Sequence, residues 1–424
     1  MNLVYANAYL VVAATRASGS SVGLYHQREL LHRMAVGFYK GKNDDGSEYS
    51  LNARQQDHGA SCHTNFIRAE RQLKDYPLLT RMWVLQERIL ATRSLHFAQE
   101  ELVWECHDGL RCECMYLDGR ANPSEVDTTD SENVFLKQLW SAFLLQEPTE
   151  APEASTDTGT TDTIMPSNKM THETWRRLIE ASSRLSLTQE EDKLPALSGI
   201  AKVMQQKGAG TYLAGLWSGD LAADLLWAAG GKRTKLWRAP SWSWASVEGG
   251  LIKFTKSRAS GIDKTYAIEI VDATCTAAGR DPTGEVADGS VTIKGMMVEC
   301  LLGRSVTESW EDWHERAIFR GEMRSWAYLD GANGQDIGDK DVGMTVYTLL
   351  MHRRLEDLNS NDATPWHALL LRKSRGIGGK APVQDAYERI GSVQSDWMVS
   401  TRRMHNTTWQ KWFKDAPTMT VTIV

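Results

Sequence analysis

The sequence is short of cysteine and of long apolar runs, and each shortage excludes a class of protein. Six cysteines in 424 residues are too few for a disulfide scaffold, so a reducing compartment is expected. The apolar run near the N-terminus, residues 9–14, is too short to span a bilayer. No basic residue precedes it, as a secretory signal would require. We therefore expect a soluble, cytoplasmic protein without a membrane span.

An excess of positive charge is also lacking. The chain has 48 Lys and Arg against 54 Asp and Glu, which gives a net charge of -6. A mildly acidic protein has no general attraction for nucleic acid or anionic membranes, so no nucleic-acid partner is expected. The length indicates two to three domains. The 16 tryptophans, twice the number of phenylalanines, supply large rigid anchors for a heavily packed core.

Residues 1–115 combine strand and helix patterns. The apolar run at 9–14 predicts a buried strand, and a proline followed by apolar residues at helical spacing predicts a helix over 77–91. Apolar and polar residues then alternate over 94–98 and continue over 102–106 after a turn, which predicts two paired strands. We expect the strand at 9–14 to lie beside the strand at 94–98, with the helix covering one face.

The middle of the chain changes in composition. Residues 116–170 are expected to be an acidic linker or surface loop, because no Lys or Arg occurs between 138 and 168 and the segment is rich in Pro, Thr and acidic residues. Residues 171–235 read as a helical region. Helical spacing predicts its helices at 175–185, 194–206 and 212–229.

Residues 236–424 are expected to form a β-rich domain of antiparallel strands, because alternating runs are joined by short turns. Asp288-Gly289 has the composition of a hairpin turn. The strands are expected at 242–247, 251–254, 266–273, 291–302, 345–352, 367–372, 387–393 and 419–424.

Tryptophan spacing suggests how this second half is anchored. Trp242 and Trp244 are two residues apart, which in a strand puts both indoles on one face and the neighbouring serines on the other. We expect both indoles to be core anchors that join the helical region to the β-rich domain. Trp310, Trp313 and His314 have helical spacing and are expected to form a core-facing stripe on a helix.

Two motifs resemble ligand sites, but one lacks the spacing and the other lacks a residue that such a site requires. Cys106, His107, Cys112 and Cys114 could supply a tetrahedral zinc set, but the thiols are not paired as Cys-x2-Cys, and neighbouring side chains point oppositely in a strand. We expect ordinary reduced thiols and no metal. The glycine-rich stretch 376–380 has Gly-Lys followed by Ala rather than by the Ser or Thr of a phosphate loop, so it is expected to be a plain loop.

The predicted helix over 77–91 carries the best candidate for chemistry. Trp83 and Glu87 are four residues apart and therefore share one helix face. A carboxylate beside an indole is partly desolvated and can stabilise a developing cation. The alternative is a peripheral glutamate that pairs with a nearby arginine at the edge of an amphipathic helix.

Several segments together resemble the fungal heterokaryon-incompatibility (HET) domain. Residues 81–90, 95–97 and 101–106 are similar to the end of that domain, and Val4-Tyr-Ala-Asn-Ala-Tyr-Leu-Val-Val-Ala-Ala14 resembles its middle. Downstream, Ala239-Pro-Ser-Trp-Ser-Trp-Ala-Ser246 is among several segments that resemble the region following the domain. The Ser-Tyr-x-Trp-Gly and Trp-Ile-Asp motifs that open the family's domain do not occur here, so a truncation within the HET domain is expected.

The resemblance implies a fold and a role. It implies an α+β chain with a partial α/β N-terminal region like that of Toll/interleukin-1 receptor (TIR) domains, here called TIR-like. A helical middle and a β-rich C-terminal domain follow. It also implies a signalling module in fungal non-self recognition and programmed cell death, with unidentified protein partners and self-association. The alternative is a TIR-like enzyme that cleaves NAD as its substrate. In that case the resemblance of Trp83-Val-Leu-Gln-Glu87 to a TIR catalytic helix makes Glu87 catalytic and Trp83 supporting.

Overall fold

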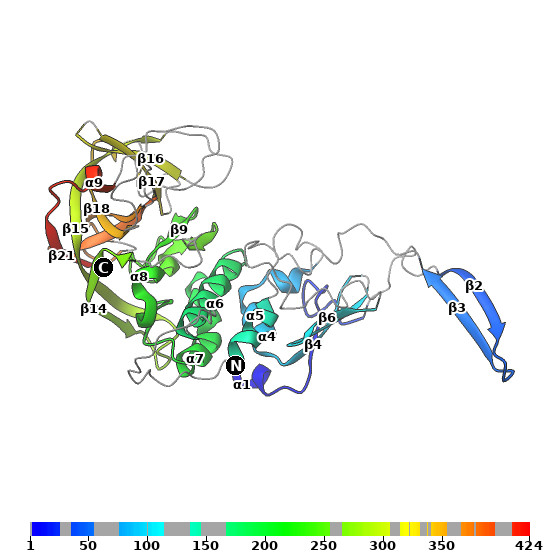
Figure 1. Cartoon of the computed structure of the whole chain (residues 1–424). Coiled ribbons are helices and arrows are strands. Elements are labelled where there is room, and N and C mark those ends of the chain that lie inside the picture. The colour runs from blue at the N-terminus through cyan, green and yellow to red at the C-terminus, as the bar shows by residue number, and fades with distance from the viewer. Residues whose placement is uncertain are drawn as a thin grey trace, which may run out of the picture. The chain divides into compact units, whose positions relative to one another are not determined.

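The computed structural model describes most of the chain and divides it into two compact units. Unit 1 consists of residues 1–156 with 184–187, and unit 2 consists of residues 157–183 with 188–424. The elements of both are labelled in Figure 1. The described residues are 2–25, 35–54, 76–99, 101–113, 136–145, 167–254, 265–305, 314–321, 323–330, 337, 341–353, 366–376, 379–394 and 409–424.

Unit 1 contains a four-stranded sheet in the order β1-β4-β5-β6. β1 (Val11–Ala13) is parallel to β4 (Arg93–Phe97). This is the neighbour that the sequence predicts for the first strand. β4 is antiparallel to β5 (Leu102–Cys106), and β5 is antiparallel to β6 (Gly109–Cys112). A separate hairpin is made by β2 (Ala35–Lys42) and β3 (Glu48–Arg54).

The predicted helix over 77–91 is present but broken at Arg81. The 3-10 helix η2 (Pro77–Thr80) ends there, and α4 (Met82–Leu90) begins. Backbone pairing explains the break: Ser186 donates its N–H to the carbonyl of Thr80 over 2.7 Å, and its own carbonyl accepts the N–H of Met82 over 3.0 Å. These bonds hold Arg81 extended, with φ −91° and ψ 130°, so one helix cannot run through.

Two further helices belong to unit 1. α1 (Asn2–Ala6) packs against α4. α5 (Leu136–Leu144) also packs against α4 and buries Trp140 and Phe143. α5 lies inside the segment 116–170 that was expected to be a linker. Its apolar residues recur at helical spacing and give the helix a face to bury, whereas residues 114–135 and 146–166 lie outside the described part of the chain.

The helices of unit 2 agree in part with the predicted helical region. α6 (Ser167–Ser182) and α7 (Ser198–Gln206) occur where helical spacing predicts helices, and η4 (Glu190–Lys193) and η5 (Pro195–Leu197) precede α7. The predicted helix over 212–229 is wrong. That range contains β7 (Tyr212–Leu213), β8 (Leu216–Trp217), η6 (Ser218–Asp220), α8 (Leu221–Asp224) and β9 (Trp227–Ala229).

The backbone conformation of Ala214 and Gly215 explains why no helix forms over 212–229. Ala214 and Gly215 have φ values of 47° and 93°, which turn the chain back between β7 and β8. A side chain at Gly215 would also collide with the indole of Trp244, whose atoms lie 2.7–2.8 Å from the position of an added Cβ. Only glycine combines a positive φ with this close approach. The segment therefore forms a tight hairpin rather than a helix.

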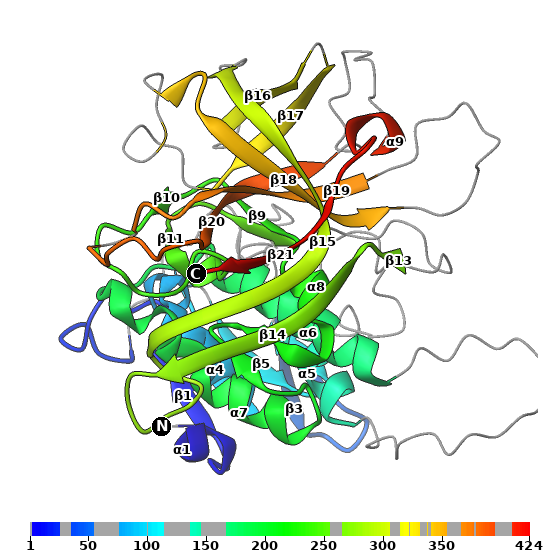
Figure 2. The same ribbon diagram turned by 90° about the vertical axis from the view of Figure 1, so that its left-hand side faces the viewer.

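The β-rich C-terminal domain is present, and its sheet has nine strands. β15 pairs with both β16 and β18, so the pairings β15-β16-β17-β20-β19-β18 close into an antiparallel ring of six strands. The long β15 is prominent in Figure 2. The nine strands are β13 (Thr265–Tyr266), β14 (Ile268–Ala277), β15 (Val286–Ser305), β16 (His314–Arg320), β17 (Met323–Leu329), β18 (Thr345–Arg353), β19 (Trp366–Lys373), β20 (Tyr387–Gln394) and β21 (Thr418–Ile423).

A single apolar cluster fills this closed ring. It includes Cys300, Leu350 and Leu370 from three of the strands. Trp366 stacks on Trp412 of α9 (Trp409–Trp412), with ring centroids 6.2 Å apart. A small closed ring of strands is filled by its own side chains, which is why the strands of this half are so rich in buried aliphatic residues.

Two local expectations for unit 2 are wrong, and a third falls outside the described residues. Asp288 and Gly289 lie within β15, and the hairpin from β14 turns before them, where Ala278 N–H donates to the carbonyl of Glu285 over 2.9 Å. His314 begins the strand β16 rather than lying on a helix. Trp310 and Trp313 lie outside the described residues.

Trp242 and Trp244 are buried, as expected, but they do not lie in a strand. Trp242 lies in a turn and Trp244 begins the 3-10 helix η7 (Trp244–Ser246). Both indoles are 0% exposed, and Ser241 and Ser243 are buried as well. Ser243 caps η7 by accepting the N–H of Ala245 over 3.0 Å. The serines therefore bond the backbone in the interior instead of facing solvent. β10 (Lys232–Arg233), β11 (Val247–Glu248) and β12 (Ile252–Phe254) complete this region.

None of the helices in the described ranges is both long and apolar enough to cross a membrane.

Candidate functional site

Glu87, the residue that the sequence singles out, is a half-buried carboxylate on α4 with a specific partner. The hydroxyl of Tyr5 on α1 donates a hydrogen bond to it. Burial raises the pKa of Glu87 above its ordinary value, while the Tyr5 bond and the positive charge of Arg81 act against that rise. Burial also raises the pKa of Tyr5, to about 12, together with the bond to Glu87 and its negative charge.

Trp83 lies one helical turn before Glu87 and is likewise half-buried. Most of the other residues of α4 are buried, namely Met82, Val84, Leu85, Gln86, Ile89 and Leu90. The helix therefore presents Trp83 and Glu87 on the part of its surface that retains access to solvent. A partly desolvated carboxylate in such a position can meet a ligand and can stabilise positive charge.

A second carboxylate of unit 1, Glu105 on β5, lies at the centre of a buried charged cluster. Its Oε2 accepts from Arg88 Nε at 2.7 Å and lies 3.2 Å from His96 Nε2 and 4.0 Å from Lys137 Nζ. The hydroxyl of Thr15 lies 2.9 Å from His96 Nδ1. We call these five residues, Thr15, Arg88, His96, Glu105 and Lys137, the Glu105 cluster.

The residues of the Glu105 cluster come from three strands and two helices of unit 1, or directly follow them. Thr15 follows β1, His96 lies on β4, Arg88 on α4 and Lys137 on α5. Burial alone would raise the pKa of Glu105, but the charges of Arg88 and Lys137 and the bond to His96 hold it well below its usual range. Burial lowers the pKa of Lys137 to about 8 and also lowers that of His96.

Sequence reasoning missed this cluster, although one signal for it exists. His96 and Glu105 occupy alternate positions of their strands, and both point to the buried face of the sheet. The apolar residues Leu95, Phe97 and Trp104 lie at the intervening positions and are only half-buried. The face that hydropathy would place inside is therefore the less covered one. The signal that could have found the cluster is two ionisable residues at diagonal positions on one face of paired strands, because His96 lies opposite Val103 and Glu105 lies opposite Ser94.

The cysteine-rich segment forms the hairpin of β5 and β6. Val103 lies opposite Cys112, and Cys106 lies opposite Gly109. Because successive residues of a strand point to opposite faces, Cys106 and Cys112 lie on different faces of the sheet. This register does not bring the two thiols to a common ligand, and Cys114 lies outside the described residues.

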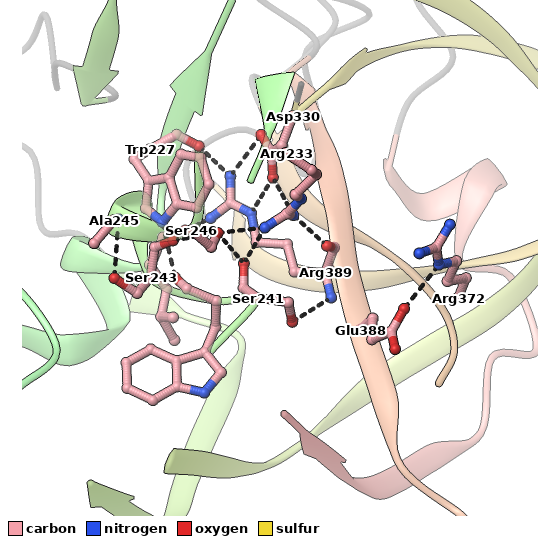
Figure 3. A network of polar contacts seen from close by, with 12 residues as sticks. Trp227, Arg233, Ser241, Ser243, Ala245, Ser246, Asp330, Arg372, Glu388 and Arg389 are labelled. Atoms are coloured by element: carbon pink, nitrogen blue, oxygen red, sulfur yellow. Dashed lines mark hydrogen bonds and ion pairs between the residues drawn. The ribbon is translucent and has the colours of Figure 1, made fainter. Parts of the chain in front are cut away.

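Unit 2 has its own buried polar network, drawn in Figure 3. Arg389 donates Nε to Asp330 Oδ2 over 2.7 Å and Nη1 to the carbonyl of Leu225 over 2.6 Å. Its guanidinium lies 3.6 Å from the centre of the Trp227 ring. Arg233 lies 3.5 Å from the same Asp330 oxygen. Each of these donors ends on a group of the protein itself, so the network fastens β20 to the segment around β9 and β10 rather than forming an open site.

Comparison with known families gives one match. Residues 1–87 match the family model described as heterokaryon incompatibility protein (HET). The first 87 residues are therefore similar to the heterokaryon incompatibility family, and the matched range contains both Tyr5 and Glu87. No curated protein and no solved structure shows a significant match.

Proposed function

We propose that this protein acts in fungal non-self recognition as a cytoplasmic signalling and interaction module that leads to programmed cell death. The match of residues 1–87 to the heterokaryon incompatibility family is the observation that carries this proposal. The matched range supplies β1 of the unit 1 sheet and the part of α4 that carries Trp83 and Glu87. The partners would be other proteins, including further copies of the chain.

Induced expression in a filamentous fungus tests the signalling role. The wild-type chain is expected to reduce viability within the induced cells. Lys137→Glu is expected to abolish this effect, because it places a second negative charge against Glu105 inside unit 1 and disrupts the fold that presents the module. Lys42→Glu, on an exposed strand of the same unit, is the matched control and should remain active. Equal viability with and without the wild-type chain would overturn the proposal.

The environment of Glu87 favours a second candidate, a TIR-like enzyme that cleaves NAD. In that reaction the bond between nicotinamide nitrogen and ribose breaks, and its electron pair leaves with nicotinamide. The ribosyl cation that remains would be stabilised by the Glu87 carboxylate. Water then adds to the cation and loses a proton. The Tyr5 bond and Arg81 support this role because both favour the ionised carboxylate that the cation requires.

The two candidates are separated by a purified-protein assay. The chain and its Glu87→Gln variant are incubated with NAD, and nicotinamide release is followed by chromatography. Gln keeps the size of the side chain but removes the charge, so the enzyme reading expects a loss of about 100-fold or more, as for other electrostatic groups in active sites. Glu48→Gln changes an exposed carboxylate of unit 1 and should cleave NAD at the wild-type rate. If the wild-type chain does not cleave NAD, the enzyme candidate is excluded and the interaction module remains.

A further inference from the structure

The Glu105 cluster has a property that purely structural ion pairs lack, because more cationic groups than anionic groups converge on it. Arg88, His96 and Lys137 all face the single oxygen Glu105 Oε2, at 2.7, 3.2 and 4.0 Å. The side chains of Glu105, His96 and Lys137 are at most 3% exposed. With His96 neutral the cluster carries two positive charges and one negative charge. A proton on His96 would add a third positive charge in a place that water scarcely reaches.

The hydrogen bonds around His96 can be satisfied in either protonation state. In the neutral form, Nε2–H donates to Glu105 and the Thr15 hydroxyl donates to Nδ1, over 2.9 Å. In the protonated form, Nδ1–H donates to the Thr15 oxygen instead. The Thr15 hydroxyl can then turn to the carbonyl of Ala13, which lies 3.3 Å away. The site therefore accepts a proton without leaving a buried polar atom unpaired, and the penalty of protonation is electrostatic.

The third positive charge acts on the most weakly held member of the cluster. Lys137 is the furthest of the three cations from Glu105, and its other contact is a 3.4 Å bond to the hydroxyl of Ser94. It is also the second residue of α5, and the next residue, Gln138, donates to the carbonyl of Cys106 over 3.1 Å. Repulsion within the cluster would therefore be relieved first by movement of α5.

We propose that the Glu105 cluster is an acid-sensitive latch, in which a proton taken up by His96 loosens α5 from the sheet of unit 1. The latch is closed when His96 is neutral and opens as the pH falls. The groups that face the latch from neighbouring elements are Glu105, Arg88 and Lys137 around His96, with Cys106 and His107 facing Lys137.

The direction of the pH dependence follows from the burial of His96. Burial, Arg88 and Lys137 lower the pKa of His96, against the opposing effect of Glu105. The folded state therefore binds a proton on His96 less readily than an open state in which His96 has its ordinary pKa. Stability contributed by the closed latch is present above the ordinary histidine pKa and is lost as the pH falls through the lowered one. Because α5 packs against α4, opening would also alter the surroundings of Glu87, a consequence that rests on the proposed function.

Hydrogen exchange of the full chain, resolved by peptide, tests the latch. After correction for the pH dependence of intrinsic exchange, amides of α5 are expected to open more often at pH 5.5 than at pH 7.5. The opening equilibrium should increase by up to about tenfold per pH unit below the ordinary histidine pKa. His96→Gln should make α5 opening independent of pH over this range. His107→Gln is the matched control, because His107 also faces Lys137 but does not contact Glu105, and it should keep the wild-type response.

A second measurement guards against a variant that simply fails to fold. Titration of the wild-type chain labelled with ¹³C-histidine should show that His96 gains its proton below the ordinary histidine range, because the closed latch disfavours its charged form. The proposal is overturned if α5 exchange does not depend on pH, if it changes equally in His96→Gln, or if His96 of the wild-type chain titrates at or above the ordinary histidine range. None of these readouts requires NAD cleavage or cell death, so failure of the latch is distinguishable from failure of the proposed function.

Discussion

Removal of the negative charge from Asp330 should strongly destabilise unit 2. Asp330 is the shared acceptor of Arg389 and Arg233, with contacts of 2.7 and 3.5 Å. The side chains of Asp330 and Arg389 are 1% and 0% exposed, and that of Arg233 is 5% exposed. Asp330→Asn preserves the shape of the side chain, removes the charge and replaces one of the two acceptor oxygens by an NH2 group, which only donates.

The expected size follows from what remains after the substitution. Breaking a buried ion pair by neutralising one partner costs about 3–5 kcal/mol, because the other charge is left buried without compensation. Here two arginines lose their counter-charge. The carbonyl acceptors of Leu225 and Trp227 still hold Arg389, and the Trp227 ring face still attracts it. These contacts limit the loss, so we expect about 4 kcal/mol rather than twice that amount.

The assay must resolve unit 2, because a chain of two units has no single well-defined unfolding free energy. Hydrogen exchange of peptides from β15–β20 at increasing guanidinium concentration gives the opening free energy of the ring. Glu269→Gln is the matched control: Glu269 pairs with Lys294 on the same sheet, but the two side chains are 66% and 52% exposed. The control should change stability by less than about 0.5 kcal/mol. An equal effect of the two substitutions would show that burial of the Asp330 network does not determine its contribution.

Three further predictions follow from single groups. Trp242→Ala and Trp244→Ala should each lower the unfolding free energy of unit 2 by about 3–5 kcal/mol, and a change below about 0.5 kcal/mol would contradict their complete burial. Tyr5→Phe should raise the pKa of Glu87 further, because the hydrogen bond that is lost favours the ionised form. A ¹³C-carboxyl titration measures this pKa, and an unchanged value would contradict the prediction. Burial lowers the pKa of Lys193 to about 7, so the unfolded state binds more protons above that pH. The unfolding free energy of unit 2 should therefore rise by about 1.4 kcal/mol per pH unit from pH 7 towards the ordinary lysine pKa. Lys193→Met should remove this rise.

The parts of the fold that were predictable depend on short-range periodicity. The strands near 9–14, 94–98 and 102–106, and α7, were all predicted from apolar spacing, and the structure has each of them. The first strand is shorter than expected, at 11–13, and it is not buried, because Val12 is 51% exposed. The break at Arg81 was not predictable, because it results from pairing with Ser186, more than 100 residues away in the sequence. Backbone bonds to a distant segment leave no trace in local periodicity.

The burial of Trp242 and Trp244 was predictable, and their local conformation was not. Two tryptophans among small residues indicate core anchors in a strand and in a turn equally well. The deciding interactions are the cap from Ser243 to Ala245 and the bond from the Trp244 indole to the carbonyl of Gly215, 2.9 Å long. The second of these requires the hairpin at Gly215, where a helix was expected. Because a helix was expected over 212–229, the contact that sets the conformation of Trp244 could not be predicted.

The candidate site was predictable only where one helix supplies it. Trp83 and Glu87 share a face because of helix geometry, and the structure places both on the half-buried stripe of α4. The partner Tyr5 comes from α1, and the Glu105 cluster needs β1, β4, β5, α4 and α5 together. Alternation in β4 and β5 is equally compatible with either face being covered, and apolar residues such as Leu95 and Trp104 favour the wrong one.

The two glutamates of unit 1 show that burial alone does not decide which carboxylate is suited to chemistry. Glu105 is more deeply buried than Glu87, and desolvation raises the pKa of both. The net shifts nevertheless have opposite directions, because Glu105 is compensated by two cations and a histidine whereas Glu87 has one hydroxyl and the weaker influence of Arg81. Glu105 is therefore fixed in its ionised form and surrounded by protein groups. Glu87 retains both access to solvent and a pKa that its surroundings can move, so of these two carboxylates it is the one that a ligand could reach and use.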